Sequence, residues 1–392
     1  MNKTLYLLIL LIINTEVWRL RFINISDNNW IIIQLLYLIA GFIFYGKFEN
    51  FSLGSKKLKY WWWWVAGTFL SMLPALYYYD QSITQSIITY RWNLLLLQIP
   101  VLCKIAPAKE EIIKATMWFA AFLWAIYFLQ LRDPYIIGYD EDDIERSLMN
   151  GSPLLLPGFL FAAIPLFYYL SEIKGNFNFK SLSIVFVCFL FLFIMQNRSM
   201  LFSVTALIGW TMLTIKQSNK WLIALTIAIL VVIVAYSTVD VWNALFEETT
   251  TQVEDEEYNR NKAYRYFIFE ACPNVWCYIF GNGFLSSHAT SHMQDMKAIG
   301  VHNSDVGFIG YWNQYGIIPI IAFLLMLIPA SVGRHNSHFI RCWAIQILIC
   351  GLTISYWGPA YMLYMSLFYY LYYLDLKEFD KTVWHHMETL NK

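Results

Sequence analysis

Cationic and titratable side chains gather in one polar segment of the chain, between Val239 and Ser304, with long apolar regions on either side. The segment contains cations, glycines and histidines: Arg260, Lys262, Arg265, Gly281, Gly283, His288, His292 and His302. Guanidinium groups bind phosphate through a planar fork, and an imidazole exchanges a proton near neutral pH. Beside a membrane, these residue types predict a site that holds a phosphate-bearing lipid and moves a proton next to it.

Two further polar positions stand where apolar helices are predicted to start. Arg198 lies in Gln196-Asn197-Arg198-Ser199, a short break between apolar stretches, which holds it near the level of lipid phosphates. His302-Asn303 precedes the next apolar run in the same direction, so both positions are predicted at one headgroup level. The structural alternatives are an arginine that snorkels to the interface and a histidine that caps a helix.

The elements that must position these residues are apolar. The 392 residues are 58% hydrophobic and 19% aromatic, with a mean hydropathy of +0.47, which excludes an ordinary soluble domain. Windows long enough for membrane helices recur about twelve times, at roughly residues 4–23, 30–46, 60–79, 84–103, 112–131, 154–170, 181–196, 200–215, 221–237, 306–330, 338–356 and 359–376. The sequence predicts an all-α, polytopic membrane protein with a large external loop between helices nine and ten.

The predicted organisation has four parts. Helices one to nine occupy residues 1–237, the external loop 238–305, helices ten to twelve 306–376, and a cytoplasmic tail 377–392. The first helix is expected to be retained, because it contains Asn14 and Glu16 and is not followed by a small-residue cleavage pattern.

The charges cancel in sum but are sorted by side. When loops are assigned alternately, 17 of the 27 basic residues fall on one face: Lys3, Lys47, Lys56, Lys57, Lys59, Lys104, Lys109, Lys114, Lys174, Lys180, Lys216, Lys220, Arg334, Arg341, Lys377, Lys381 and Lys392. This face is predicted to be cytoplasmic and to hold both termini. The other face carries eight arginines: Arg19, Arg21, Arg91, Arg132, Arg146, Arg198, Arg260 and Arg265. Their enrichment indicates an external anionic ligand, with pairing to external acids as the alternative.

Several weaker signals complete the external face. The acidic runs 140–145 and 247–257 have no metal-ligand spacing and are expected to be solvated loops. A surface helix is predicted from Tyr258 towards Phe280, ended or kinked at Pro273, and the amides of Gly281-Asn282-Gly283 are expected to face an anion. A bond between Cys272 and Cys277 is not favoured. The aromatics Tyr311, Trp312 and Tyr315 either line an acceptor groove or pack between helices.

The order and spacing of these motifs over residues 190–330 resemble the bacterial O-antigen polymerase and O-antigen ligase family, whose members have about twelve helices and a large periplasmic loop between the ninth and tenth. The matching motifs are Asn197-Arg198-Ser199, Arg265 ahead of Gly281-x-Gly283, and His302-Asn303 followed by Gly316-Ile317-Ile318-Pro319. The remaining chain agrees in hydropathy and topology alone.

The resemblance implies a glycosyltransferase of the bacterial inner membrane, independent of metal and cofactor, with a polyprenyl-diphosphate-linked oligosaccharide as donor. By that resemblance, Arg198 and Arg265 bind the diphosphate, and His302 orients or deprotonates the acceptor hydroxyl. Arg260 and Arg91 are second-rank phosphate ligands, and Asn303, Gly281 and Gly283 are supporting residues. The expected partners are the lipid bilayer, a chain-length regulator and a flippase. Binding to nucleic acid is not expected.

Alternatives remain at two levels. A polymerase is favoured over a ligase, which would transfer the finished glycan to an acceptor. A non-enzymatic flippase or exporter would need charges inside the helices, whereas here the polar groups lie at the surface. Asp305 close to His302 would favour a charged imidazole, which suits anion binding better than base catalysis.

Overall fold

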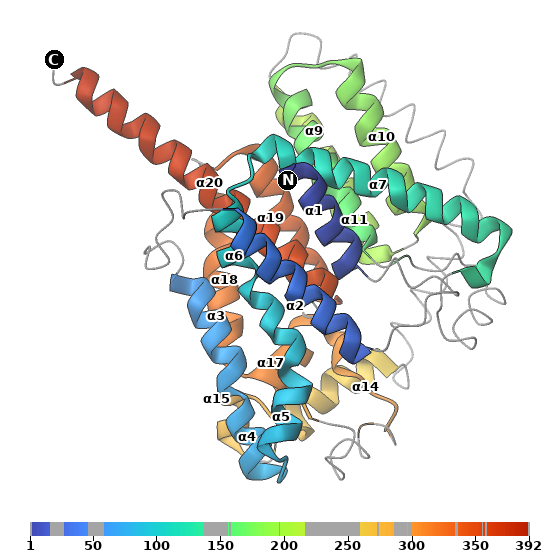
Figure 1. Ribbon diagram of the computed structural model, residues 1–392, viewed down its shortest axis with the longest axis vertical. Helices are drawn as coiled ribbons and strands as arrows, with labels where there is room; N and C mark the ends of the chain where they lie inside the picture. The colour runs from blue at the N-terminus through green and yellow to red at the C-terminus, as the bar shows by residue number, and fades with distance from the viewer. Residues whose placement is uncertain are drawn as a thin grey trace.

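The computed structural model describes residues 2–15, 27–45, 59–136, 156, 158–195, 197–215, 259–272, 274–285, 296, 299–333, 336–354, 356 and 359–390. Across these ranges the chain is helical and forms no strand (Figure 1), which confirms the all-α prediction. Several predicted features lie outside the described residues: the ninth helix at 221–237, both acidic runs, Arg19, Arg21, Arg146, His288 and His292.

The helices follow the apolar windows closely. They are α1 (Lys3–Asn14), α2 (Asp27–Phe44), α3 (Lys59–Leu70), α4 (Met72–Tyr78), α5 (Ile83–Tyr90), η2 (Arg91–Leu97), α6 (Gln98–Ile105), α7 (Lys109–Arg132), η3 (Pro134–Ile136), η4 (Phe159–Ala162), α9 (Ala163–Gly175), α10 (Phe179–Ile194), α11 (Arg198–Thr214), α14 (Asn259–Arg265), η5 (Tyr266–Glu270), α15 (Val275–Phe280), η6 (Asn303–Val306), α17 (Gly307–Tyr315), α18 (Ile317–Val332), α19 (His338–Cys350) and α20 (Pro359–Leu390). Two windows are divided where one helix was expected, at Ser71 and at Gly316.

Two helical stretches of the described chain are long and apolar enough to cross a membrane. They are Ile83–Ile105, with 23 residues, and Lys109–Arg132, with 24 residues. Shorter apolar helices are Lys3–Asn14, Asn29–Phe44, Phe179–Ile194, Ile317–Val332 and His338–Cys350.

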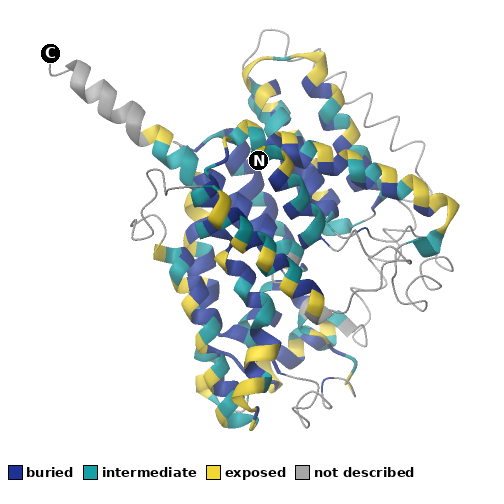
Figure 2. Cartoon of the chain, in the orientation of Figure 1, coloured by how far each residue is buried: buried dark blue, intermediate teal, exposed yellow. Residues whose placement is uncertain are grey.

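The core runs through the middle of the helix bundle, with exposed residues on its outer faces and at its ends (Figure 2). Large aromatic side chains fill much of it. Trp343 meets Tyr364 edge to face at 5.1 Å, and Trp61 stacks on Tyr369 at 5.4 Å. Ring pairs at these distances contribute attraction beyond the area they bury, which explains how a chain this rich in aromatics packs tightly.

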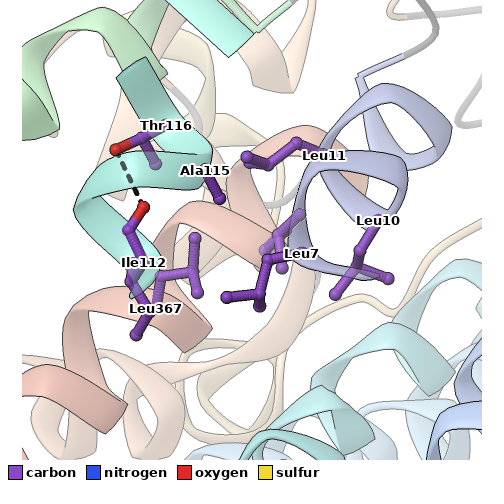
Figure 3. Close-up of a pocket in the computed structure, with 8 residues that line it drawn as sticks. Leu7, Leu10, Leu11, Ile112, Ala115, Thr116 and Leu367 are labelled. Atoms are coloured by element: carbon purple, nitrogen blue, oxygen red, sulfur yellow. Dashed lines mark hydrogen bonds between the residues drawn. The ribbon is translucent and has the colours of Figure 1, made fainter. Parts of the chain in front are cut away.

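A gap between α1, α7 and α20 illustrates this packing (Figure 3). Leucines of α1 face Ala115 on α7 and Leu367 on α20. The hydroxyl of Thr116 donates to the carbonyl of Ile112 at 3.1 Å, so this polar group is satisfied within its own helix. The gap is therefore a packing site between helices and offers a ligand no polar partner.

One end of the bundle collects lysines that the sequence assigned to a single face. Lys3 Nζ donates to the carbonyl of Ala106 at 2.8 Å, and Lys104 lies over the ring of Phe42. Lys109 lies over Phe339 at the start of α19, and Lys174 contacts His338. These contacts bring together the start of α1, α7 and α19 and the last turns of α6 and α9, so this region is called the lysine-rich end.

Helices α11 and α19 pack antiparallel and define the opposite end. The contact of Thr211 with His338, at 2.8 Å, lies at the lysine-rich end. The contact of Ser199 with Thr353, at 2.5 Å, lies at the other end of the same helix pair. Arg198, the first residue of α11, therefore sits at the end away from the lysines. In Figure 1, α4, α5, α14 and α15 gather at the end opposite α9 and the N-terminus.

Candidate functional site

Three segments that carry predicted site residues meet at one turn, residues 351–354, which follows α19. Ser199, next to Arg198, has its hydroxyl 2.5 Å from that of Thr353. Tyr264 of α14 donates its hydroxyl to the carbonyl of Leu352 at 2.5 Å. The Phe308 amide, shortly after His302, donates to the carbonyl of Gly351 at 2.8 Å. The turn thereby joins segments that are far apart in sequence into one region.

Arg198 is positioned by the cap of α11. The Asn197 side chain accepts from the Met200 amide at 3.0 Å, as expected of an N-cap asparagine. Arg198 is half-buried at the first helical position, one residue from the contact with Thr353. The predicted start of a helix at Asn197-Arg198 is confirmed.

The two arginines of α14 differ in their surroundings. Arg265 is 81% exposed and lies 3.6 Å from Glu270, an ion pair that adds little stability in water. Arg260 is half-buried, and its Nε has no hydrogen-bond partner among the described residues. It lies one helical turn before Tyr264, the residue that contacts the 351–354 turn. Arg260 is therefore the better placed of the two to bind an anion there.

The pKa of Tyr264 is affected by the nearby charge of Arg260. Burial raises the pKa of the Tyr264 hydroxyl, and the positive charge of Arg260 acts in the opposite direction. The hydroxyl therefore keeps its proton at neutral pH and can donate it to the carbonyl of Leu352.

The helix predicted from Tyr258 towards Phe280 is confirmed, with its expected break between Glu270 and Val275, but its first part changes winding. After α14 the chain forms a π-helix, η5, in which the Ala271 amide donates to the carbonyl of Tyr266, five residues back, at 2.8 Å. Tyr266, Phe267 and Ala271 all turn inward to a small apolar cluster with Val301 and Val306. This cluster attaches the arginine-bearing helix to the segment that carries His302.

His302 is exposed and immediately precedes η6, and its side chain does not cap that helix. Asn303 is fixed by α17, because its Nδ2 donates to the carbonyl of Gly310 and to Oδ1 of Asn313, both at 3.2 Å. Gly310 permits this approach, since a Cβ there would lie 1.9 Å from the Asn303 carbonyl oxygen. Asn303 thus supports the backbone on which His302 is presented.

The expectation that the Gly281-Asn282-Gly283 amides face an anion is wrong. The amide of Gly281 donates to the carbonyl of Cys277, that of Asn282 to Asn313, and that of Gly283 to Gln314, each at 2.8 Å. With all three donors used internally, none points at a ligand. Gly281 and Gly283 allow the chain segments to pack closely. Both have positive φ, and a Cβ on either would collide with neighbouring backbone.

Arg91 lies apart from the 351–354 turn. Its guanidinium donates to the carbonyl of Ile88 and packs over Trp92 at 5.4 Å. The preceding residue, Tyr90, accepts from the Phe284 amide at 2.9 Å and so supports the loop after Gly283. None of these contacts brings Arg91 close to Arg198 or His302. They give no support to the prediction that Arg91 is a phosphate ligand.

The aromatics of α17 pack between helices and do not line an open groove. Tyr311 and Tyr315 are buried, with rings 4.4 Å apart, and Trp312 donates its indole N–H to the carbonyl of Tyr278 at 2.7 Å. The hydroxyl of Thr68 donates to the Trp64 carbonyl, so the Tyr311 hydroxyl donates to Thr68 and accepts from the Trp64 indole at 2.7 Å.

Removing that hydroxyl tests the packing role. We expect Tyr311→Phe to lower the free energy of unfolding by about 1–3 kcal/mol, because it removes the hydroxyl that accepts from the buried Trp64 N–H. The measurement is thermal unfolding of the purified protein in detergent. Tyr77→Phe is the matched control, because Tyr77 is 79% exposed and should tolerate the change. Equal stability of the two variants would contradict the assigned hydrogen bond.

Cys272 and Cys277 are free thiols. Burial raises the pKa of the Cys272 thiol to about 12, with a smaller contribution from Cys277. Cys272 therefore remains protonated at neutral pH and is a poor nucleophile. Cys272 packs against the buried Asn313, whose Nδ2 donates to the Cys272 sulfur. The Oδ1 of Asn313 accepts from Asn303.

Several residues of this region were not predicted from the sequence: Tyr264, Asn313, Leu352 and Thr353. The only sequence signal was the polarity of Asn313 within an apolar helix, which is unusual enough to ask for a partner. Among the described residues, no group of three His, Cys, Asp or Glu side chains is arranged to hold a metal ion.

Guanidinium groups from two helices and an exposed imidazole from a third segment thus lie on segments that contact one turn, at the end away from the lysines. Fixed cations of this kind can bind an anionic group and stabilise charge that develops on it. The chain matches no protein-family model, and no curated protein is significantly similar to it in sequence.

Proposed function

We propose that this protein is a polysaccharide polymerase of the bacterial inner membrane. It joins oligosaccharide repeat units, each carried on a polyprenyl diphosphate, at the external face of the membrane. The observation that supports this most is the meeting of α11, α14 and α17 at the 351–354 turn, because Arg198 and Arg260 lie on the first two helices and His302 shortly precedes the third. A polyanionic donor with a hydroxyl acceptor is the substrate pair that suits these groups.

In the proposed membrane topology about twelve helices span the bilayer and both termini are cytoplasmic. The lysine-rich end would face the cytoplasm, and the 351–354 turn would face outward. The two long apolar helical stretches and the shorter apolar helices are compatible with this arrangement.

The proposed reaction is a single displacement at the anomeric carbon of the donor. The acceptor hydroxyl oxygen forms a bond to that carbon while the bond from the carbon to the diphosphate oxygen breaks. The electron pair leaves with the polyprenyl diphosphate, whose growing charge Arg198 and Arg260 stabilise, with Arg265 as an outer cation. His302 orients the hydroxyl and accepts its proton.

The test is the length distribution of surface polysaccharide in cells whose own copy of the gene is replaced. The replacements are wild type, Arg198→Ala, Arg260→Ala, Arg265→Ala or His302→Ala, each checked for its amount in the membrane. We expect single repeat units on the carrier or on its acceptor for Arg198→Ala, Arg260→Ala and His302→Ala. Arg265→Ala should shorten chains less, because its exposed guanidinium already pairs with Glu270.

Arg132→Ala is the control, since Arg132 is an exposed arginine at the far end of α7 from Lys109. Long chains that stay on the carrier would identify the protein as a ligase, because chain growth would then be intact. Donor that accumulates at the cytoplasmic face would favour a flippase. Normal length and normal attachment in every variant would refute the site.

A further inference from the structure

A second cluster of cations surrounds a buried histidine at the lysine-rich end. Lys174, in the last turn of α9, has its Nζ 3.2 Å from Nδ1 of His338, the first residue of α19. Thr211, near the end of α11, has its hydroxyl 2.8 Å from Nε2 of the same ring. Three helix ends therefore meet at His338.

The hydrogen bonds define the charge of this histidine. An ammonium group can only donate, so Nδ1 of His338 accepts from Lys174 and carries no proton. The ring is then neutral with its proton on Nε2, which it donates to Thr211, and Thr211 donates onward to the carbonyl of Leu207 at 2.8 Å. His338 holds the Lys174 ammonium in place and leaves its charge intact.

Arg341 adds a second cation, one turn along α19. Its guanidinium carbon lies 5.9 Å from the ring centre of Trp210, and Lys174 Nζ lies 5.5 Å from the same ring. The half-buried Arg341 side chain makes no hydrogen bond or ion pair with any described residue, and its Nε is enclosed. The five N–H donors of the Arg341 guanidinium and the Lys174 ammonium thus lie near the same ring.

Two acids of this end have other partners. Asp375 of α20 accepts from the Ser337 amide at 2.6 Å, at the start of α19. The negative charge of Glu172, two residues before Lys174, acts on Tyr168 and Tyr169 of the same helix. No described carboxylate pairs with the Arg341 guanidinium, which is therefore suited to an anionic ligand.

We propose that Lys174, Arg341 and Trp210 form a binding site for the phosphate group of an anionic membrane lipid. A phosphodiester offers the oxygens that a guanidinium fork binds, and an indole beside it is typical of the headgroup level. Leu213, 88% exposed and three residues after Trp210 on the same helix, provides apolar surface for an acyl chain. Basic clusters at the cytoplasmic ends of membrane helices bind such headgroups.

This site lies at the end opposite the 351–354 turn and does not depend on the proposed enzymatic function. It requires only that the helices stand in a bilayer. A lipid held here would link α9, α11 and α19, and α11 and α19 also carry Arg198 and the 351–354 turn.

The test uses the full-length protein in nanodiscs of phosphatidylcholine that contain increasing fractions of phosphatidylglycerol. Bound lipid is counted by native mass spectrometry, and the midpoint of thermal unfolding is recorded in parallel. We expect Arg341→Gln and Lys174→Gln to bind phosphatidylglycerol roughly tenfold more weakly than wild type, the change expected from losing one charge-assisted hydrogen bond. Arg341→Lys should bind at an intermediate level, because it keeps the charge and loses the fork.

Lys180→Gln is the matched control, because Lys180 is an exposed lysine in the first turn of α10, close in sequence to Lys174, and should bind as wild type does. Each variant is compared with its own midpoint in pure phosphatidylcholine, so that a general loss of stability is not mistaken for a loss of lipid. Wild-type affinity in both Gln variants would overturn the site. Equal protection by inorganic phosphate in pure phosphatidylcholine would overturn the assignment to a lipid.

Discussion

Gly316→Ala is expected to lower the free energy of unfolding by about 3 kcal/mol or more, a large effect for a single methyl group. Gly316 has a φ of +83°, which an L-residue rarely adopts. A Cβ there would lie 2.2 Å from the carbonyl oxygen of Ile279 and 2.7 Å from the amide nitrogen of Gly281. These are backbone atoms, so rotation of a side chain cannot relieve the contact.

The measurement is thermal unfolding of the purified protein in detergent, together with its yield in the membrane. Gly209→Ala is the matched control, because nothing lies within 4 Å of a Cβ at this exposed position of α11. Replacing a glycine in the middle of a helix should there be neutral or stabilising, by up to about 1 kcal/mol. A Gly316→Ala protein as stable as Gly209→Ala would show that α15 and α17 do not approach each other closely at Gly281 and Gly316.

Arg198→Ala is expected to lower the turnover of a polyprenyl-diphosphate-linked donor about 100- to 1,000-fold, the range for losing one fixed group that stabilises developing charge. Arg198→Lys should recover only part of that loss, because an ammonium group cannot bind two phosphate oxygens through a planar fork. The measurement is donor consumption by purified protein in liposomes, with Arg132→Ala as the control.

The comparison separates charge from geometry. Full activity of Arg198→Lys would mean that a positive charge alone is needed at the start of α11. Full activity of Arg198→Ala would remove this residue from the donor site. The unfolding temperature of each variant must match wild type, because Ser199 next to it contacts Thr353 and a shifted helix start would also disturb the turn.

Helix positions were predictable because they depend on local apolar composition, and the cap at Asn197 marked the start of α11 correctly. The division of the 306–330 window at Gly316 was not, because its cause is the approach of Gly281 from another segment. The same approach of the two segments turns the Asn282 and Gly283 amides towards carbonyls of α17 and not towards an anion. A glycine pair has the same sequence whether its amides face an anion or a neighbouring carbonyl.

The site was predictable in its elements and not in its details. The helix starts at Arg198 and after His302 were predictable, because each stands where a polar break meets an apolar helix. The difference in exposure between Arg260 and Arg265 was not, because the rotation of α14 depends on its packing against Val301 and Val306. The 351–354 turn gave no signal, since Gly351-Leu352-Thr353-Ile354 reads as part of an apolar run.

The winding of η5 determines which way Arg265 points. In an α-helix, side chains three and four residues apart are neighbours, and a pair five apart diverges. Arg265 and Glu270 are five apart and meet at 3.6 Å because the intervening helix is wound as a π-helix. Deleting one residue between them would let the segment return to ordinary α-helix. The length of this stretch therefore determines whether Arg265 and Glu270 can meet.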